Sequence, residues 1–283
     1  MITANQKPAP SGSAHRAEVK AGQRFEFGAN WARFLEVLNE NRIATAEQSL
    51  RDMLQTESLA GLHFLDAGSG SGLFSLAARR LGATVHSFDF DPASVACTQE
   101  LRRRYFPDDP QWHVEEASVL DADYIGRLGQ FDVVYSWGVL HHTGQMWPAL
   151  DNVSRTVAPG GKLFIAIYND QGTASRRWLR LKKVYNRSGL FKKPIAGAVA
   201  VMLWWRPWVK DALRLRPFES WRAVRHQRGM SAWHDVVDWV GGYPFEVAKP
   251  EQIFEFYRDR GFTLVRLVTC GGSLGCNQFV FRK

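Results

Sequence analysis

The chain has 283 residues, of which 45% are hydrophobic, and it carries a formal net charge of +8. This length allows one large domain or two small ones, and the hydrophobic content excludes global disorder. Three cysteines are too few for a disulfide framework and lack partners at metal-ligand spacing, so no metal is expected. Because no charged-then-apolar signal peptide is found, we expect a reducing, cytoplasmic setting.

The N-terminal part divides into two expected segments. Residues 1–22 are rich in Pro, Ser, Gly and Ala, which predicts a mobile tail. Residues 23–60 carry apolar side chains at helical spacing from Trp31 onward, which indicates one or two helices. The aromatic side chains around Gly28 have two open interpretations. They form either a hydrophobic staple at the helix entry or a lid over a ligand, with Trp31 facing the substrate.

A glycine-rich turn follows the first expected strand. The apolar run of 64–67 meets Gly68, Gly70 and Gly72, and residues 73–81 then have helical apolar spacing. Glycines let the backbone take positive φ and let a ligand approach the main chain, while the helix N-terminus offers unpaired N–H groups. Strand, turn and helix together predict a site for a nucleotide-like ligand. A glycine-rich turn without a ligand is the alternative.

The second expected strand, residues 84–89, ends in acidic residues. Asp89 lies about twenty residues beyond the first glycine, where a dinucleotide-type fold places the acid that accepts hydrogen bonds from ribose hydroxyls. Phe90 is next to it and can lie against an adenine face. The alternative is that Asp89 or Asp91 caps the helix that Pro92 begins, which fits Asp91 better.

Three more strands are expected at residues 112–116, 131–136 and 162–168. A helix between the last two is expected to end at Pro159-Gly160-Gly161. Strands that alternate with helices indicate a parallel sheet with helices on both faces.

These motifs resemble those of class I S-adenosylmethionine-dependent methyltransferases, especially the ubiquinone-biosynthesis-like group of small-molecule methylases. The acid at Asp66, two residues before Gly68, and the G-x-G-x-G spacing are typical of that family, whereas nicotinamide-binding motifs space their glycines G-x-G-x-x-G. The resemblance implies an α/β, Rossmann-like fold with a seven-stranded, mainly parallel sheet and an antiparallel last strand. Residues 61–168 and 250–283 would form this cofactor-binding core.

The resemblance also implies a set of contacts to S-adenosyl-L-methionine. Asp66, Gly68, Gly70 and Gly72 would hold its methionine part, and Asp89 its ribose. Ser118, where many members have an aspartate, and Val119 would lie at the adenine, with Phe90. Ser136 and Trp137 would face the methionine and the reacting methyl group.

Methyl transfer to a hydroxyl needs alignment and a group that takes the proton. His141 and His142 follow the fourth strand, and imidazole suits this role, although the two side chains cannot face one pocket equally. One of them is either the base or a structural residue. His234 is a second candidate for acid-base chemistry.

Residues 169–249 depart from the family pattern and are expected to form a helical cap that binds the acceptor. Between Gln171 and Met230 there are fifteen Lys or Arg residues against two acidic ones, so this stretch carries +13 and the rest −5. Arg225, Arg228 and Tyr243 are the acceptor-binding candidates. The apolar run of 194–205 is too short to span a bilayer and has three alternatives, namely a lid, a homodimer contact and a peripheral membrane contact.

The expected function is methyl transfer to a small-molecule acceptor with an oxygen nucleophile, such as a phenol, quinol or sugar hydroxyl. The basic segment favours an anionic or lipid-like acceptor. Nitrogen and sulfur acceptors, RNA methylation and a non-catalytic cofactor-binding role are the alternatives. Nucleic acid is not the expected partner, because neither an appended RNA-binding module nor a base-methylation motif is found.

Overall fold

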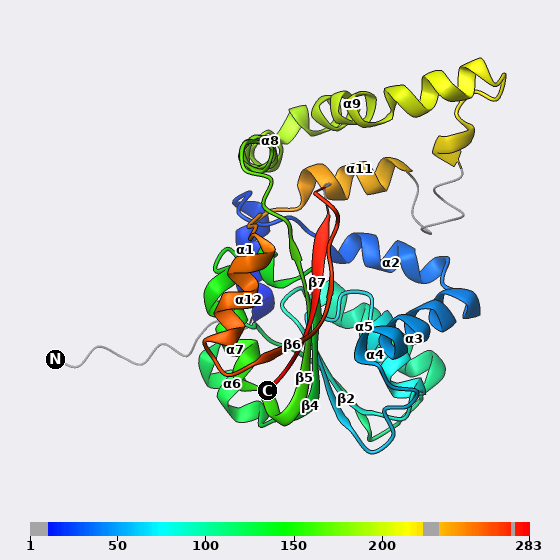
Figure 1. Ribbon diagram of the computed structural model, residues 1–283. Helices are drawn as coiled ribbons and strands as arrows, with labels where there is room; N and C mark the ends of the chain where they lie inside the picture. Colours follow the sequence, from blue (N-terminus) through cyan, green and yellow to red (C-terminus); the bar gives the residue numbers. More distant parts are fainter. Residues whose placement is uncertain (1–10, 223–231, 273–274) are drawn as a thin grey trace.

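A seven-stranded sheet forms the centre of the molecule (Figure 1). The computed structural model describes residues 11–222, 232–272 and 275–283. The strand order is β3-β2-β1-β4-β5-β7-β6. The strands are β1 (His63–Ala67), β2 (Thr84–Asp89), β3 (Trp112–Glu116), β4 (Phe131–Trp137), β5 (Val157–Tyr168), β6 (Thr263–Val268) and β7 (Cys276–Arg282). The first five strands pair in parallel, and β7 is antiparallel to both β5 and β6. The expected fold is confirmed.

Helices cover both faces of the sheet, because the central strands are apolar on both sides. One face carries α3 (Glu40–Leu54), α4 (Leu73–Arg80) and α5 (Pro92–Tyr105), and the other carries α6 (Ala122–Leu128), α7 (Met146–Arg155) and α12 (Pro250–Arg258) (Figure 1). Each face has its own core cluster, with Leu50 and Leu101 in the first and Leu150 and Ile253 in the second. The parallel strands therefore lie rigidly between two packed layers.

The expected end of the helix before β5 is wrong. The helix α7 ends at Arg155, and β5 begins at Val157, so Pro159-Gly160-Gly161 belongs to the strand. The pairing of β4 with β5 shifts register between Phe131 and Val133, and Gly160 has a φ of +77°. A β-bulge accommodates the proline and the glycines that the sequence pattern assigned to a helix end.

Part of the expected N-terminal tail is also wrong. Residues Ser11–Lys20 form helix α1, and α2 (Gly28–Glu36) follows it. Composition predicted a tail, but α1 is held by a long-range contact that composition does not encode. Its His15 is buried, with its ring centroid 5.6 Å from that of Phe90 and its Nε2 3.7 Å from Oδ2 of Asp91.

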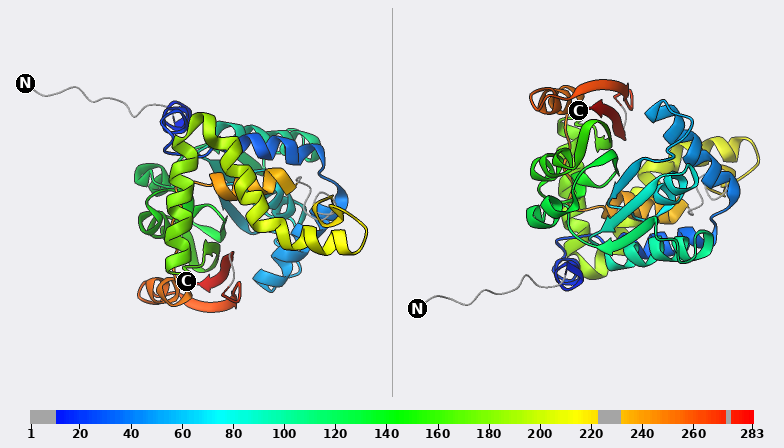
Figure 2. Two further views of the ribbon diagram at one scale, coloured as in Figure 1. Left: turned by 90° about the horizontal axis from the view of Figure 1, so that it is seen from above. Right: turned by 90° about the horizontal axis from the view of Figure 1, so that it is seen from below.

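The described part of residues 169–249 is mostly helical. It comprises α8 (Thr173–Arg187), the short helix η2 (Gly189–Phe191), α9 (Lys192–Leu213) and α11 (Ala232–Gly241). Trp178, Val199 and Val240 belong to a separate core cluster that joins α8, α9 and α11. These helices lie above the end of the sheet where β5 leads into α8 (Figures 1 and 2). Of the helices described, none combines the length and apolar character needed to cross a membrane.

Candidate active site

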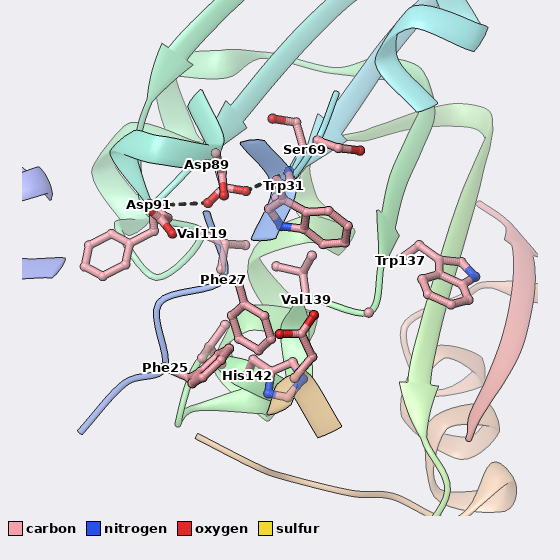
Figure 3. Close-up of a pocket in the computed structure, with 18 of the residues that line it drawn as sticks. Phe25, Phe27, Trp31, Ser69, Asp89, Asp91, Val119, Trp137, Val139 and His142 are labelled. Atoms are coloured by element: carbon pink, nitrogen blue, oxygen red, sulfur yellow. Dashed lines mark hydrogen bonds between the residues drawn. The ribbon is translucent and has the colours of Figure 1, made fainter. Parts of the chain in front are cut away.

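A cavity of about 790 Å³ lies at the carboxyl edge of β1, β2 and β4, below the cap helices. Figure 3 shows Asp89 and Asp91 on one side of it, Phe25, Phe27 and His142 gathered on another, and Val139 between them. Open α/β sheets bind their ligands at this edge, where the strand order reverses between β1 and β4. The cavity thus has an acidic side, with Asp89 and Asp91, and an aromatic side, with Phe25, Phe27 and His142.

The glycine turn after β1 forms one wall of the cavity. Gly68 and Gly70 have φ values of +87° and +54°. A Cβ atom on Gly68 would lie 2.4 Å from Cγ1 of Val139, and one on Gly70 would lie 3.2 Å from Nε1 of Trp31. The positive φ favours glycine at both positions and the close contact adds to this at Gly68, so the main chain reaches the cavity surface. Gly72, with a φ of +79°, begins helix α4 as its N-cap.

Asp89 ends β2 and faces the cavity (Figure 3). Its Oδ2 accepts the N–H of Gly70 at 2.9 Å, and its Oδ1 accepts the N–H of Asp91, also at 2.9 Å. A carboxylate has about four acceptor positions, so Asp89 keeps acceptor capacity for a ligand hydroxyl beside its bonds to the backbone, which include the N–H of Phe90. Burial raises the pKa of Asp89 to about 6, although the backbone hydrogen bonds lower it. The neighbouring Asp91 is the N-cap of α5, as expected, and it accepts the N–H of Ala93.

Asp66 lies deeper, in β1, and also lines the cavity. Its Oδ2 accepts the hydroxyl of Ser75 at 2.5 Å. Burial raises the pKa of Asp66 to about 7, and the like charge of Asp89 adds to this rise. A cationic group, such as an amine, would stabilise the ionised carboxylate at this position.

The residues expected at an adenine ring come together on the acidic side. Phe90, Ser118 and Val119 all line the cavity. The guanidinium of Arg24 lies 4.9 Å from the Phe90 ring centroid, so a residue of the N-terminal segment packs on this aromatic ring. The hydroxyl of Ser118 accepts the N–H of Leu120 at 3.2 Å.

Ser136 and Trp137, at the end of β4, differ in their placement. Ser136 is fully buried and donates its hydroxyl to the carbonyl of Ala67 at 2.7 Å, and it is not among the described residues that line the cavity. The expectation that it faces the ligand is therefore wrong, because the hydroxyl joins β4 to β1 instead. Trp137 lines the cavity, is 44% exposed and donates its Nε1 hydrogen to Oε1 of Gln278 at 3.3 Å.

The two adjacent histidines both belong to the short helix η1 (Leu140–His142), and their ring centroids lie 4.5 Å apart with the rings tilted by 56°. His142 lines the cavity (Figure 3), and its Nδ1 lies 2.6 Å from the carbonyl of Pro244, to which it donates. In this tautomer Nε2 is the acceptor. Burial lowers the pKa of His142 to about 3, so the imidazole is neutral at neutral pH.

His141 is fully buried behind the cavity wall, with its ring centroid 4.1 Å from that of Tyr168. Burial lowers its pKa well below the usual value, and the charges of His142 and Lys182 act in the same direction. It is not among the described residues that line the cavity. Of the two histidines, only His142 is placed to meet a ligand there.

The remaining candidates are divided. Trp31 lines the cavity. Tyr243 does not belong to the described lining; its carbonyl accepts the N–H of Phe25 at 2.8 Å. Arg225 and Arg228 lie outside the described residues. His234 belongs to α11, but its side chain lies outside the description.

Several lining residues were not among the sequence candidates: Arg24, Phe25, Phe27, Tyr168, Trp204 and Trp239. They come from the N-terminal segment, the end of β5 and the cap. The signal for them was the clustering of aromatic residues on both sides of the core, which indicated a lid and a cap without identifying single residues.

Comparison with known proteins assigns this site to a family. Residues 65–163 match the model of a methyltransferase domain. The chain is 30% identical over 181 residues to a ubiquinone biosynthesis O-methyltransferase of Methylobacterium sp., covering 57% of this chain and 67% of the relative. It is 34% identical over 119 residues to a tRNA U34 carboxymethyltransferase of Methylococcus capsulatus, covering 42% of this chain but only 36% of that relative.

A solved structure agrees in fold. A magnesium protoporphyrin IX methyltransferase from Synechocystis PCC 6803 with bound S-adenosylhomocysteine superposes with a TM-score of 0.55 at 15% identity, covering 96% of this chain and 99% of the other. The cavity has features that suit S-adenosyl-L-methionine, because two acids, Asp66 and Asp89, line it together with a glycine-rich turn whose main chain a ligand can approach. S-adenosyl-L-methionine is the cofactor, and the chain belongs to the class I S-adenosylmethionine-dependent methyltransferases.

Proposed function

We propose that the enzyme methylates a hydroxyl oxygen of an apolar, aromatic or lipid-like small molecule. The observation that carries this proposal is the position of His142 on the aromatic side of the cavity, opposite Asp89 on the acidic side. The two sides share one continuous space of about 790 Å³, which lies in the range of ligand-binding cavities. Cofactor and acceptor can therefore meet without water between them.

On the acidic side, the proposed roles follow the chemistry of each group. Asp66 binds the amine of the cofactor, Asp89 accepts from the ribose hydroxyls, and the glycine turn lies against the methionine part. Phe90, Ser118 and Val119 surround the adenine. The cofactor supplies an electrophilic methyl group when bound, and the protein needs no further activation of it.

On the aromatic side, Phe25, Phe27, Trp204 and Trp239 form an apolar surface for the acceptor. His142 orients the acceptor hydroxyl through Nε2, which is held ready because Nδ1 donates to Pro244. An oxygen that carries both its proton and a new methyl group is a far stronger acid than an imidazolium. A weakly basic imidazole can therefore take this proton as the oxygen–carbon bond forms.

The relative named as an O-methyltransferase supports oxygen as the acceptor atom. The relative that acts on tRNA shares a match over little more than a third of its own length, so it gives RNA weaker support.

Transfer of a ¹³C-methyl group from S-adenosyl-L-methionine tests this function. The full chain is incubated with cell extract fractionated into RNA, lipid and polar small molecules, and the products are read by NMR. We expect a methoxy carbon signal in the lipid or small-molecule fraction, and a weaker one with the Asp89→Ala variant when S-adenosyl-L-methionine is limiting. Label in RNA, or an N-methyl or S-methyl carbon, would contradict the proposal.

A further inference from the structure

Helix α9 has a second apolar face that none of the residues described in the structure covers. Its inner face packs against the cap, because Ala196, Val199 and Ala200 are buried in the cluster shared with α8 and α11. Its outer face carries Met202, Trp205, Val209 and Leu213, which are 53%, 50%, 51% and 80% exposed. Their spacing of three, four and four residues places them in one stripe along the helix.

The outer position of α9 is visible in the ribbon views. In Figure 1 it is the outermost helix of the molecule, beyond α11 and far from the sheet, and Figure 2 shows it crossing the top of the protein. Leu190 and Phe191 before α9, and Leu215 after it, are exposed as well. An exposed apolar surface that continues over a whole helix is typical of an interaction site.

The same segment is strongly cationic. Residues 173–222 contain thirteen Lys or Arg residues, and their two acidic residues are Asp211 and Glu219. Asp211 is buried and accepts hydrogen bonds from Ser220, and Glu219 pairs with Arg216 at 3.1 Å. The exposed face of α8 carries five basic residues: Arg176, Arg177, Arg180, Lys183 and Arg187. Most of this positive charge is thus not neutralised by the acids of its own segment.

Apolar stripe and charge are interleaved on α9 itself. Arg206 and Lys210 are exposed next to the stripe, and the guanidinium of Arg206 lies 5.3 Å from the Trp205 ring centroid. Tryptophan and arginine at neighbouring positions are typical of helices that lie in the headgroup region of a bilayer. Basic residues near a membrane surface are attracted by anionic lipids.

We propose that α9 docks the enzyme on an anionic lipid bilayer, with Met202, Trp205, Val209 and Leu213 inserted at the interface. A second copy of the chain fits this surface less well, because a symmetric contact would bring two cationic segments together. A nucleic acid as the partner would account for the positive charge of this segment but not for the exposed apolar stripe. The opposite side of α9 supplies Leu203 and Trp204 to the cavity lining, so docking holds the cavity next to the bilayer.

The proposed docking does not depend on the identity of the acceptor. It can therefore be tested by membrane binding alone, without measuring methyl transfer. The full chain is floated with vesicles of phosphatidylcholine, with and without phosphatidylglycerol. We expect binding to the anionic vesicles that weakens as salt is raised. The variant M202Q/W205Q/V209Q keeps helix propensity and charge, and should bind at least about tenfold more weakly. Val184→Gln, an equally exposed apolar residue on α8, is the matched control and should bind like the wild type.

Unchanged binding of S-adenosylhomocysteine would establish that the triple variant is folded. A second variant, R206Q/K210Q, leaves the apolar stripe intact and should lose affinity for anionic vesicles at low salt. The proposal is overturned by absence of flotation with anionic vesicles, or by equal flotation of the triple variant. It is also overturned by a wild-type dimer in light scattering that the triple variant converts to monomer, or by RNA binding without flotation. Methyl transfer is measured separately, so docking and the proposed function fail independently.

Discussion

Asp89 is the residue whose replacement most simply tests the acidic side of the cavity. Asp89→Asn keeps an oxygen that can accept the N–H of Gly70 but removes the charge that we assign to the ribose hydroxyls. We expect cofactor binding to weaken by about 1–3 kcal/mol, measured by calorimetry. Asp121→Asn is the control, since Asp121 caps α6 and does not belong to the described cavity lining. Equal affinities of wild type and Asp89→Asn would refute the assignment.

The raised pKa of Asp89 predicts how cofactor affinity depends on pH. Burial places this pKa at about 6, so the carboxyl is protonated below that pH and loses acceptor capacity. The contribution of Asp89 to cofactor affinity should therefore increase as the pH rises from 5 to above 6. Above that range this contribution should stay constant. Calorimetric titrations across this pH range should show a smaller pH dependence of cofactor affinity in Asp89→Asn than in the wild type. An equally strong pH dependence in the variant would rule out Asp89 as its source.

His142 gives a different pH prediction. Its pKa of about 3 lies below the usual value near 6.5, so its protonation should not produce an acid limb in kcat/KM near pH 6.5. His142→Ala should lower kcat by roughly 10²–10⁴-fold with little change in cofactor affinity. His141→Ala, measured at low temperature, should keep kcat, because His141 contributes to packing. The reverse order of effects would make His141 the proton acceptor.

The sequence predicts well those residues whose role is set by local backbone. Asp91 was expected to cap α5, because Pro92 marks the helix start, and it does. Ser136 was expected to face the ligand, but its hydroxyl finds the carbonyl of Ala67 on a strand sixty-nine residues earlier. That His142 lines the cavity while His141 does not likewise depends on tertiary packing, which adjacent sequence positions do not reveal.

At the scale of elements, a buried lysine in α8 should make the free energy of unfolding depend on pH. Lys182 has no exposed surface, donates to the carbonyl of Trp239, and lies over the rings of Trp239 and Phe245 at 5.2 and 4.9 Å. Burial lowers the pKa of Lys182 to about 7, against 10.5 for a lysine in water. Between these values the unfolded chain binds more protons than the native state, so lysine burial makes stability rise with pH.

Lys182→Met should remove this dependence. The free energy of unfolding of the wild type, relative to that of the variant, should rise by about 1.4 kcal/mol per pH unit from pH 7 toward pH 10. Chemical denaturation at several pH values measures it. Lys183→Met, at the exposed neighbouring position, is the control and should follow the wild type. Parallel pH curves for wild type and Lys182→Met would contradict the shifted pKa.

The elements themselves were largely predictable where hydrophobic period and turn residues agree. The strand at residues 112–116 was expected with the bounds that it has, and α12 begins at the expected Pro250. The helix α1 was missed, because its composition resembles a tail and its burial depends on the distant Phe90 and Asp91. The start of β5 was not predicted, because a β-bulge accommodates a proline and two glycines within the strand.

At the scale of the whole molecule, we propose that the core recognises the cofactor and the cap recognises the acceptor. Trp204 and Trp205 are neighbours on α9, but Trp204 lines the cavity and packs on Trp221 at 5.0 Å, whereas Trp205 is half exposed. Trp204→Ala should raise KM for a soluble acceptor by about tenfold and leave cofactor affinity unchanged. Trp205→Ala should change neither value. Equal effects of both substitutions on KM would indicate a general loosening of the cap.

We propose that one cavity holds the cofactor on its acidic side and presents the reacting end of that cofactor to the aromatic side. A crystal structure of the full chain with S-adenosylhomocysteine tests it most directly. We expect the ribose hydroxyls to donate to Asp89, the amine to lie at Asp66, and the sulfur to point toward His142. Binding with the sulfur directed away from His142 and from the surrounding aromatic residues, or binding outside this cavity, would contradict it.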